Sequence, residues 1–515
     1  MRFLLVLLGA LLLASCSGGN RKNAPLSDQN TIVRLSDSDA RGLDPQMVSD
    51  LASTRIASDQ FEGLTRFNER GDAEPGLAKD WDIAPDGKKW TFHLRPALRF
   101  SDGKSISPAV FAKALARIRD EKSGSPHTAL FAIIDRVETA GPLSVEIYLA
   151  SPFPQLPALL AHPAMAALPF HRIEVSGEAW TSERPLVTSG AYRLIEWQLS
   201  QAITLAANPQ WHDGAPATPS IIWRPMDNIL SGMRLVLAKG ADTSSDFPAS
   251  RQAWLEERYP ELVHTSGYLA TYYFAFNTRR PPFDDIRVRQ ALAMAIDRQW
   301  MAETMIAAGN EPAWGLLPPG LMGGKAYKPE WASWPQNRRL SVARQLLKEA
   351  GYGPEKPLRF EIRFNSSSEH RRAAVAMATM WRELGVNAAL LNSEASLHFD
   401  SLKRGDFMLA RSGWVADLPA PENFLSVHRS SAGPQNYSGY TSLAFDAALD
   451  AALAEPDPKK REAQMRSAEI LLLHDQPVIP LYFYVNRALV QPNIGGWEDN
   501  ISNMHPSRTL FRMRL

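Results

Sequence analysis

Hydrophobic and polar residues alternate along several short runs of the chain, and this alternation predicts β-strands with one buried face. The run WTFHLR at 90–95 alternates in this way, and so does VEIYLASP at 145–152. The segment 189–211 contains two such runs separated by polar residues, which predicts a hairpin that closes at Asn208 and Pro209. Further strands are expected at 221–225, 271–278, 358–366, 387–392 and 477–485.

Other segments repeat apolar residues every three or four positions, which is the spacing of one helix face. The segment 286–306 follows this spacing throughout. Another helix is expected to begin at Ser107, with this serine and Pro108 as its cap and first turn. Further helices are expected at 231–242, 341–352, 369–386 and 459–475. Strands and helices together predict an α/β chain, with a strand, turn and helix unit of α+β type at 77–117.

The N-terminus has the pattern of a secretory signal, because Met1 and Arg2 precede an apolar run that ends in small residues. The run is too short to span a bilayer. Leu13 to Cys16 (LASC) resembles the bacterial lipobox, so we expect a signal peptide at 1–15, a lipid anchor on Cys16 and a flexible tether at 16–28. The alternative is an ordinary secretory peptide that leaves Cys16 unmodified. Either way, a single cysteine cannot form an intramolecular disulfide.

Composition argues against several classes of partner. The 56 basic and 55 acidic residues are scattered and give a formal net charge of +1, so nucleic acid is not an expected partner. The histidines are not at metal-ligand spacing, and no cofactor motif is present, so neither a metal nor a cofactor is expected. Ser101 and Lys104 fit the S-x-x-K pattern of penicillin-recognising enzymes, but Gly103 between them favours a turn. A hydrolase is kept as an alternative, and the prediction is that the protein is not an enzyme.

Seven ordered blocks of the sequence resemble the peptide-binding lipoproteins of bacterial ABC importers, the oligopeptide- and dipeptide-binding type of extracellular solute-binding protein family 5. The blocks are 43–46, 61–67, 77–111, 189–197, 272–298, 410–417 and 477–484. The resemblance implies a two-lobed α/β periplasmic-binding-protein fold (class II, large peptide-binding type) with an extra α+β domain on the first lobe. Carried onto this chain, the first lobe is 29–68, 187–268 and 478–515, the extra domain is 69–186 and the second lobe is 269–477.

The same resemblance implies how a peptide is held, and a peptide offers a backbone, an α-ammonium and an α-carboxylate to any general binder. Asp417 matches the family aspartate that pairs with the ammonium, and Arg411 matches an arginine used for a ligand carboxylate. Trp414 with Tyr272 and Tyr273 is expected to line side-chain pockets. The residues expected to pair with the peptide backbone are Ser49, Asp50, Leu51, Gly413, Trp414 and Val415.

The resemblance predicts a monomeric receptor in the bacterial envelope that captures short peptides and delivers them to a membrane permease. The loop Leu418-Pro419-Ala420-Pro421 departs from the family, which has an aromatic residue and an acid there. Val415 stands where some relatives have a cysteine, and Ser49 where some have an acid. Ligand length and side-chain preference therefore stay open. Two alternatives keep the fold: a non-peptide solute (metal chelate, haem, sugar or opine), or an envelope chaperone or sensor.

Overall fold

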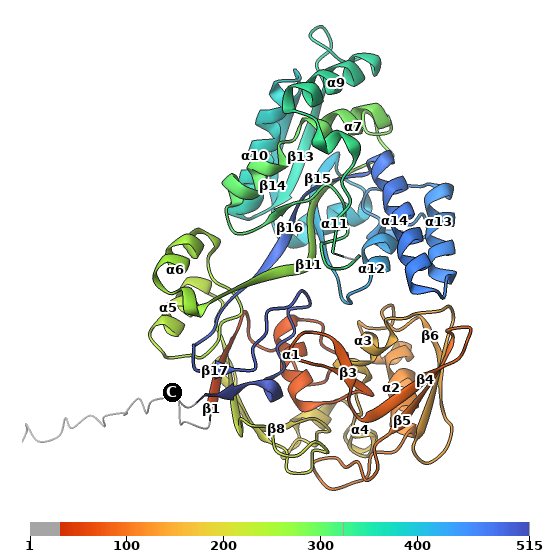
Figure 1. Ribbon diagram of the computed structural model, residues 1–515, viewed down its shortest axis with the longest axis vertical. Helices are drawn as coiled ribbons and strands as arrows, with labels where there is room; N and C mark the ends of the chain where they lie inside the picture. Colours follow the sequence, from red (N-terminus) through yellow and green to blue (C-terminus); the bar gives the residue numbers. More distant parts are fainter. Residues whose placement is uncertain (1–30, 323, 514–515) are drawn as a thin grey trace, which may run out of the picture.

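The computed structural model describes residues 31–322 and 324–513. Within these residues, helices and strands form two lobes, and sheets of four or more strands form the centre of each part (Figure 1). The expected signal peptide at 1–15, the expected tether at 16–28 and Cys16 lie outside the described residues.

The first lobe is built on a sheet with the strand order β1-β10-β9-β8, in which β1 is parallel to β10 and the other pairs are antiparallel. Its strands are β1 (Thr31–Ser36), β10 (Ser220–Pro225), β9 (Ala202–Ala207) and β8 (Tyr192–Gln198). The last two confirm the predicted hairpin. Helix α1 (Leu51–Gln60) also belongs to this lobe and was not predicted, although Ile56 and its neighbours bury a helical stripe.

The extra domain contains an antiparallel sheet of order β4-β5-β7-β6. Its strands are β4 (Ala78–Ile83), β5 (Lys89–Leu94), β7 (Ser144–Leu149) and β6 (Ile134–Thr139). The predicted alternation is confirmed in β5, where Trp90, Phe92 and Leu94 are buried. One continuous apolar core joins this sheet to the first lobe, so the two form one folded body.

Helix α2 (Ala109–Arg119) follows this domain's turn as expected, but the predicted serine cap is wrong. Pro108 is the N-cap residue, and no side chain donates or accepts a capping hydrogen bond there. The Ser107 carbonyl instead accepts the N–H of Val110. The helix therefore begins on proline, whose fixed φ already suits a first turn.

The second lobe is built on a mixed sheet of order β12-β16-β11-β15-β13-β14. Its strands are β12 (Glu311–Pro312), β16 (Val478–Leu489), β11 (Val263–Phe276), β15 (Leu409–Val415), β13 (Arg359–Asn365) and β14 (Asn387–Ser393). Residues 269–276 of β11 are buried on both faces. A strand buried on both faces is a continuous apolar run rather than an alternating one.

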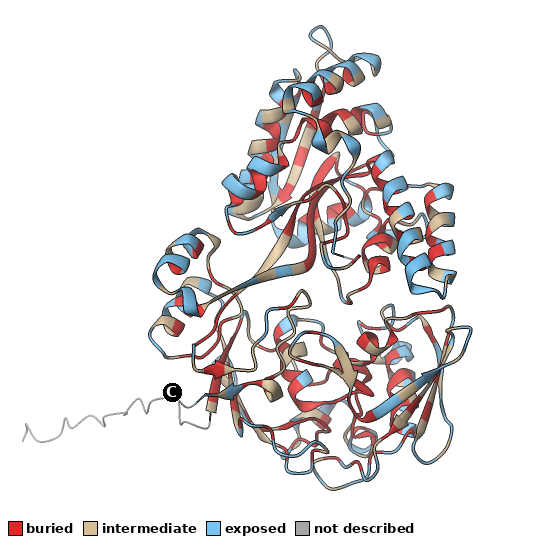
Figure 2. Cartoon of the chain, viewed as in Figure 1, coloured by how far each residue is buried: buried red, intermediate tan, exposed pale blue. Residues whose placement is uncertain are grey.

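Helices surround this sheet and expose their outer turns to solvent, as the pale blue stretches in Figure 2 show. They include α7 (Ile286–Ala295), α9 (Gln336–Glu349), α10 (Ser368–Arg382), α11 (Ala395–Arg404), α12 (Pro421–Leu425), α13 (Leu443–Ala454) and α14 (Pro458–Asp475). Four helices predicted from spacing are present as α5 (Ile229–Leu237), α9, α10 and α14.

The single helix predicted at 286–306 is wrong, because the chain leaves helical geometry at Ile296. Asp297 then caps a new helical stretch, accepting the N–H of Trp300 at 3.0 Å. The buried guanidinium of Arg298 donates to the carbonyl of Ala293 at 2.8 Å, which satisfies one helix-end acceptor. The break is therefore stabilised by Arg298, a buried charged residue inside the predicted segment that the apolar spacing does not take into account.

Strands β11 and β16 run together from the second lobe down to the first (Figure 1). They pair from Ala275 with Val478 to Val263 with Leu489, with an irregular register between Gly267 and Thr271. At one end Ile479 packs in the core of the second lobe, and at the other end Leu489 packs in the first. This pair of strands connects the lobes, and the predicted boundaries at 268 and 477 stay predictions.

Candidate functional site

A cavity of about 500 Å³ lies between the second lobe and the body formed by the first lobe and the extra domain. Ser49 before helix α1 and Thr54 in this helix line the cavity from the first lobe. The second lobe contributes Trp414 in β15, Asp417 in the loop after it and Glu422 in α12. From the extra domain the lining includes Pro126, His127, Ala129, Leu130, Ile133, Ser151, Phe153 and His162. The cavity therefore draws on all three parts of the fold.

Asp417 presents an ionisable carboxyl to this cavity. Its side chain is exposed to the cavity solvent, but the walls exclude part of its hydration, and this burial raises the pKa of the carboxyl. The Asn423 side chain and the nearby His127 lower the pKa in part. Asn423 also accepts the backbone N–H of Asp417 at 3.3 Å and the indole N–H of Trp414 at 2.9 Å. One amide therefore positions both residues.

Two histidines stand on the opposite wall, and burial disfavours the charged form of both. Burial lowers the pKa of His162 to about 3, and the pKa of His127 is also lowered by burial. His127 donates its Nε2 proton to the carbonyl of Val48 at 2.8 Å, and His162 accepts the N–H of Ala164 on Nδ1. Among the described residues that line the cavity, none is a lysine or an arginine. The Asp417 carboxylate thus has no cationic partner in the cavity wall.

Strand β15 leads to Asp417 and carries an unpaired edge. On one side it pairs with β11 along its whole length, whereas β13 pairs only with Leu409 and Ala410. The N–H of Ala416 donates to the Leu269 carbonyl on β11, so by alternation the backbone groups of Gly413 and Val415 point to the unpaired side. Of these two, Val415 is half exposed. This edge is open to an added strand.

Arg411 lies at the other end of that edge in a polar cluster. Its guanidinium donates to the Tyr484 hydroxyl at 2.9 Å and to Asn365 at 3.5 Å, and stacks over the ring of Tyr272. Its Nε is buried without a hydrogen-bond partner, and no carboxylate among the described residues forms an ion pair with it. Nearby His370 has its pKa lowered to about 3 by burial and by Arg411. Arg411 therefore has no ion-pair partner in this cluster.

Neither Tyr272 nor Tyr273 is a pocket residue, which corrects the expectation from sequence. Their exposed fractions are 0% and 3%. Tyr272 stacks on Tyr482 with ring centroids 4.5 Å apart, and its hydroxyl bonds to His370. Adjacent residues of a strand face opposite sides of the sheet, and helices cover both sides here. Trp414, by contrast, does line the cavity.

The N-terminal segment also departs from the expectation at Leu51. An extended edge at Ser49, Asp50 and Leu51 was expected, but Leu51 is the first residue of helix α1. Asp50 is its N-cap, and its carboxylate accepts the N–H of Ser53 at 2.9 Å. Asp50 therefore has a structural role, while Ser49 remains in the cavity wall.

The loop Leu418-Pro419-Ala420-Pro421, which departs from the family in composition, contacts the opposite side of the cleft. Leu418 and Ala420 are buried against the apolar core of the first lobe and extra domain, so this loop reaches across the cleft. Glu422 forms a buried ion pair with Arg461 at 2.6 Å. Sequence reasoning missed Asn423, Glu422 and His127 as site residues. His127 is distant from Asp417 along the chain, and Glu422 and Asn423 follow it closely but match no motif that marks them as site residues.

Residues 31–322 and 324–513 were also searched for the serine and lysine site of a hydrolase, for a metal site and for a membrane-spanning helix. Ser101 accepts the N–H of Thr188 at 2.9 Å, and Gly103 has a positive φ, so 101–104 is the predicted turn. This part of the chain brings no three metal-ligating side chains together. We also find no candidate membrane-spanning helix in it.

The fold and the cleft define the class of protein. The chain matches the model of bacterial extracellular solute-binding proteins, family 5 (middle region), over residues 72–436, and it belongs to this family. Members of this family are solute-binding receptors and are not a family of enzymes. The family match confirms the resemblance, and the similarity to a solved structure confirms the two-lobed fold expected from it.

Particular relatives narrow the class further. The chain is 34% identical to the periplasmic oligopeptide-binding protein OppA of Escherichia coli (strain K12), over 93% of this chain and 92% of that protein. It is 32% identical to the periplasmic murein peptide-binding protein MppA of the same organism, over 98% and 97%. Its structure is similar to the unliganded open form of the murein tripeptide-binding protein MppA, with a TM-score of 0.82, 30% identity and coverage of 95% and 98%.

Proposed function

We propose that this protein is a receptor that captures short peptides between its lobes for an ABC importer. One observation carries the proposal: the unpaired edge of β15 leads directly into a cavity whose carboxylate, Asp417, has no cationic partner in the lining. A strand edge binds any peptide backbone, and the carboxylate then fixes the α-ammonium. The names of the relatives support the same ligand class.

The two charged ends of the edge give the peptide a direction. The α-ammonium is expected at Asp417 and the α-carboxylate toward Arg411, because each group then meets the opposite charge. Six positions of extended strand separate these residues, or about 20 Å, and the arginine side chain shortens the gap. Peptides of about four to six residues fit that span. The cavity beside Asp417 is lined by apolar residues such as Leu130 and Phe153 together with polar ones, which suits a first side chain of varied character.

Blocked peptides test this assignment on the unmodified protein. We expect calorimetric titration to give tight binding of a free pentapeptide and weak binding of its N-acetyl derivative, with a smaller loss for the C-terminal amide. Equal affinity for the free and the acetylated peptide would refute the role of Asp417. Native mass spectrometry of the protein from its own envelope identifies the co-purified ligand; a metal chelate, haem, sugar or opine in place of a peptide would keep the fold and change the function.

The place of action is part of the same proposal. We infer a monomer on the periplasmic side of the bacterial envelope, held to a membrane by lipid on Cys16 and partnered by a permease and its ATPase. Periplasmic relatives support the compartment. Mass spectrometry of the mature N-terminus tests the anchor: a triacylated Cys16 is expected. An unmodified cysteine would leave a free receptor, and Cys16→Ser provides the matched control.

A further inference from the structure

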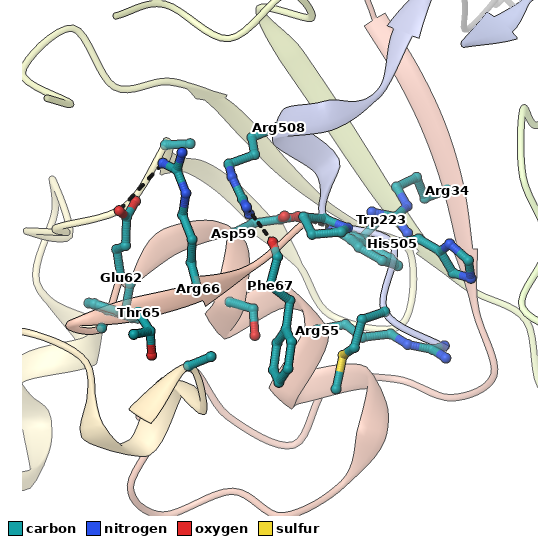
Figure 3. A pocket seen from close by; sticks show the side chains of 17 residues that line it. Arg34, Arg55, Asp59, Glu62, Thr65, Arg66, Phe67, Trp223, His505 and Arg508 are labelled. Carbon is teal, nitrogen blue, oxygen red and sulfur yellow. Dashed lines mark hydrogen bonds and ion pairs between the residues drawn. The ribbon is translucent and has the colours of Figure 1, made fainter. Parts of the chain in front are cut away.

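A second, smaller pocket lies inside the first lobe, away from the cavity at Asp417. Its walls come from strand β1, helix α1 with the segment after it, strand β10 and the C-terminal segment 504–508 (Figure 3). It holds about 60 Å³. Its charged and ring-nitrogen lining residues are Arg34, Arg55, Asp59, Glu62, Arg66, His505 and Arg508. Four guanidinium groups thus share one pocket with two carboxylates.

The two carboxylates are already fully engaged. Asp59 accepts the N–H and the hydroxyl of Ser507 at 3.1 and 2.6 Å, and the indole N–H of Trp223 at 2.9 Å. Glu62 accepts from the rings of Trp211 and His212 at 2.6 and 2.7 Å. Glu62 also pairs with Arg66 at 3.6 Å, an interaction drawn in Figure 3, so both carboxylates already have partners within the fold.

Two of the arginines are engaged in the same way. Arg66 pairs with Glu74 at 2.9 Å and with Asp213 at 2.8 Å. Arg508 pairs with Glu74 at 3.2 Å and donates to the carbonyl of Phe67, the bond drawn in Figure 3. These residues form a closed network on one side of the pocket.

Arg34 and Arg55 are different, because neither forms an ion pair among the described residues. Arg34 is 5% exposed; it donates to Ser507 at 2.6 Å and stacks on Trp223, while its Nε has no hydrogen-bond partner. The Arg55 side chain forms no hydrogen bond within the described part of the chain. Burial lowers the pKa of Arg34 to about 10 and also lowers that of Arg55. Asp59 is the opposing charge near Arg34 and Asp37 the one near Arg55, but neither carboxylate forms an ion pair with either guanidinium.

His505 adds a second buried nitrogen without a hydrogen-bond partner, after Nε of Arg34. Burial lowers the pKa of this ring to about 2, so it is neutral, and its Nδ1 is buried without a hydrogen bond. The ring stacks on Trp497 with centroids 3.7 Å apart, which fixes its plane. Figure 3 shows His505 beside Arg34, with Arg55 reaching in from helix α1. Two buried nitrogens without partners, Arg34 Nε and His505 Nδ1, therefore lie in one pocket, and such groups are costly.

We propose that this pocket of the first lobe binds one small oxyanion between Arg34, Arg55 and His505. The volume corresponds to about four water molecules, which suits a phosphate or a carboxylate and excludes a whole peptide residue. Guanidinium groups bind both anions through paired N–H donors. The anion would bridge β1, α1 and the C-terminal segment. Two sources share this chemistry: free inorganic phosphate, and a small free carboxylic acid.

Titration of the ligand-free mature protein tests the pocket. In chloride buffer at constant ionic strength, we expect sodium phosphate to bind at one saturable site by calorimetry and to raise the melting temperature saturably. Arg55→Gln should weaken this binding at least tenfold, and it removes no hydrogen bond of the described fold. Arg372→Gln, an exposed change on α10, should bind phosphate like the unmodified protein. A parallel titration with sodium acetate distinguishes the sources, because binding of acetate alone assigns the pocket to carboxylates.

Two results would overturn the proposal: no saturable binding of either anion, or equal affinity in the Arg55→Gln variant and the unmodified protein. If Arg55→Gln does not fold, Arg55→Lys is the substitute; it keeps the charge without the planar donor fork, so a severalfold weaker site is expected and an unchanged one contradicts the assignment. Peptide binding at Asp417 does not depend on this outcome, so the two proposals fail separately.

Discussion

The two ends of the β15 edge differ in how their charges are held. Asp417 is exposed in a cavity whose lining mixes polar and apolar residues, faces His127 and His162, and is positioned through its backbone by Asn423. Arg411 is partly buried, donates to Tyr484 and stacks on Tyr272. The carboxylate end lacks a counter-charge, whereas the guanidinium end already sits in a formed polar cluster.

The difference indicates where ligand binding changes the molecule most. The Asp417 carboxylate has lost part of its hydration, and a bound cation compensates for this loss with an ion pair. Closure of the lobes then strengthens the ion pair by excluding water. A carboxylate brought to Arg411 adds to a cluster that the protein has already ordered, so less changes there. We therefore expect the ammonium end to dominate affinity and the arginine end to tune it.

Removal of the Asp417 charge should have the largest effect. Asp417→Asn leaves a buried ammonium without a partner in the closed state, and we expect a loss of about 3 kcal/mol, or about 100-fold in Kd, for free peptides. The N-acetyl peptide should bind the variant and the unmodified protein alike, which is the control. Calorimetry measures both, and an unchanged Kd for the free peptide would contradict the account.

Acidification should reproduce that loss gradually. The pKa of Asp417 is raised in the free protein, and a bound ammonium must lower it, so binding requires the ionised form. The affinity for free peptides is therefore highest at pH values above the pKa of Asp417 in the ligand-free protein. Below that pKa it falls by about tenfold for each pH unit. Burial lowers the pKa of both facing histidines, His127 and His162, which opposes their protonation. A pH series should show the slope in the unmodified protein and none in Asp417→Asn.

At the other end, Arg411→Gln should cost less. It removes one charge-assisted contact, and we expect about tenfold weaker binding of peptides with a free carboxylate. C-terminal amides of the same peptides should show little change. Equal losses for acid and amide would mean that Arg411 acts only through the fold, and thermal unfolding of the variant separates the two readings.

The smallest effect is expected at the residue that positions the strong end. Asn423→Ala removes the acceptor for Trp414 and for the backbone of Asp417, with an expected loss of about 1 kcal/mol, or about fivefold in Kd. The exposed change Asn337→Ala is the matched control. A loss as large as that of Asp417→Asn would show that the loop collapses without this amide.

Local pattern predicted much of the fold. The alternation at 90–95 and the hairpin at 189–211 appear as strands because alternate residues bury one face. The strand predicted at 271–278 is present, but the resemblance led to a wrong expectation for Tyr272 and Tyr273, because their unbroken apolar run indicates burial on both faces. Reasoning from local pattern also missed helix α1, although Asp50 caps it and Ile56 lies on its buried stripe.

The sequence by itself determined the elements, the family and the candidate charges at positions 411 and 417, because periodicity and motif spacing are local properties of the chain. Only the tertiary structure decided which charges lack a partner. His127 faces Asp417, and Arg34 lies beside His505, through contacts between distant segments. Desolvation and pairing depend on every neighbour in space, and no spacing along the chain records those neighbours.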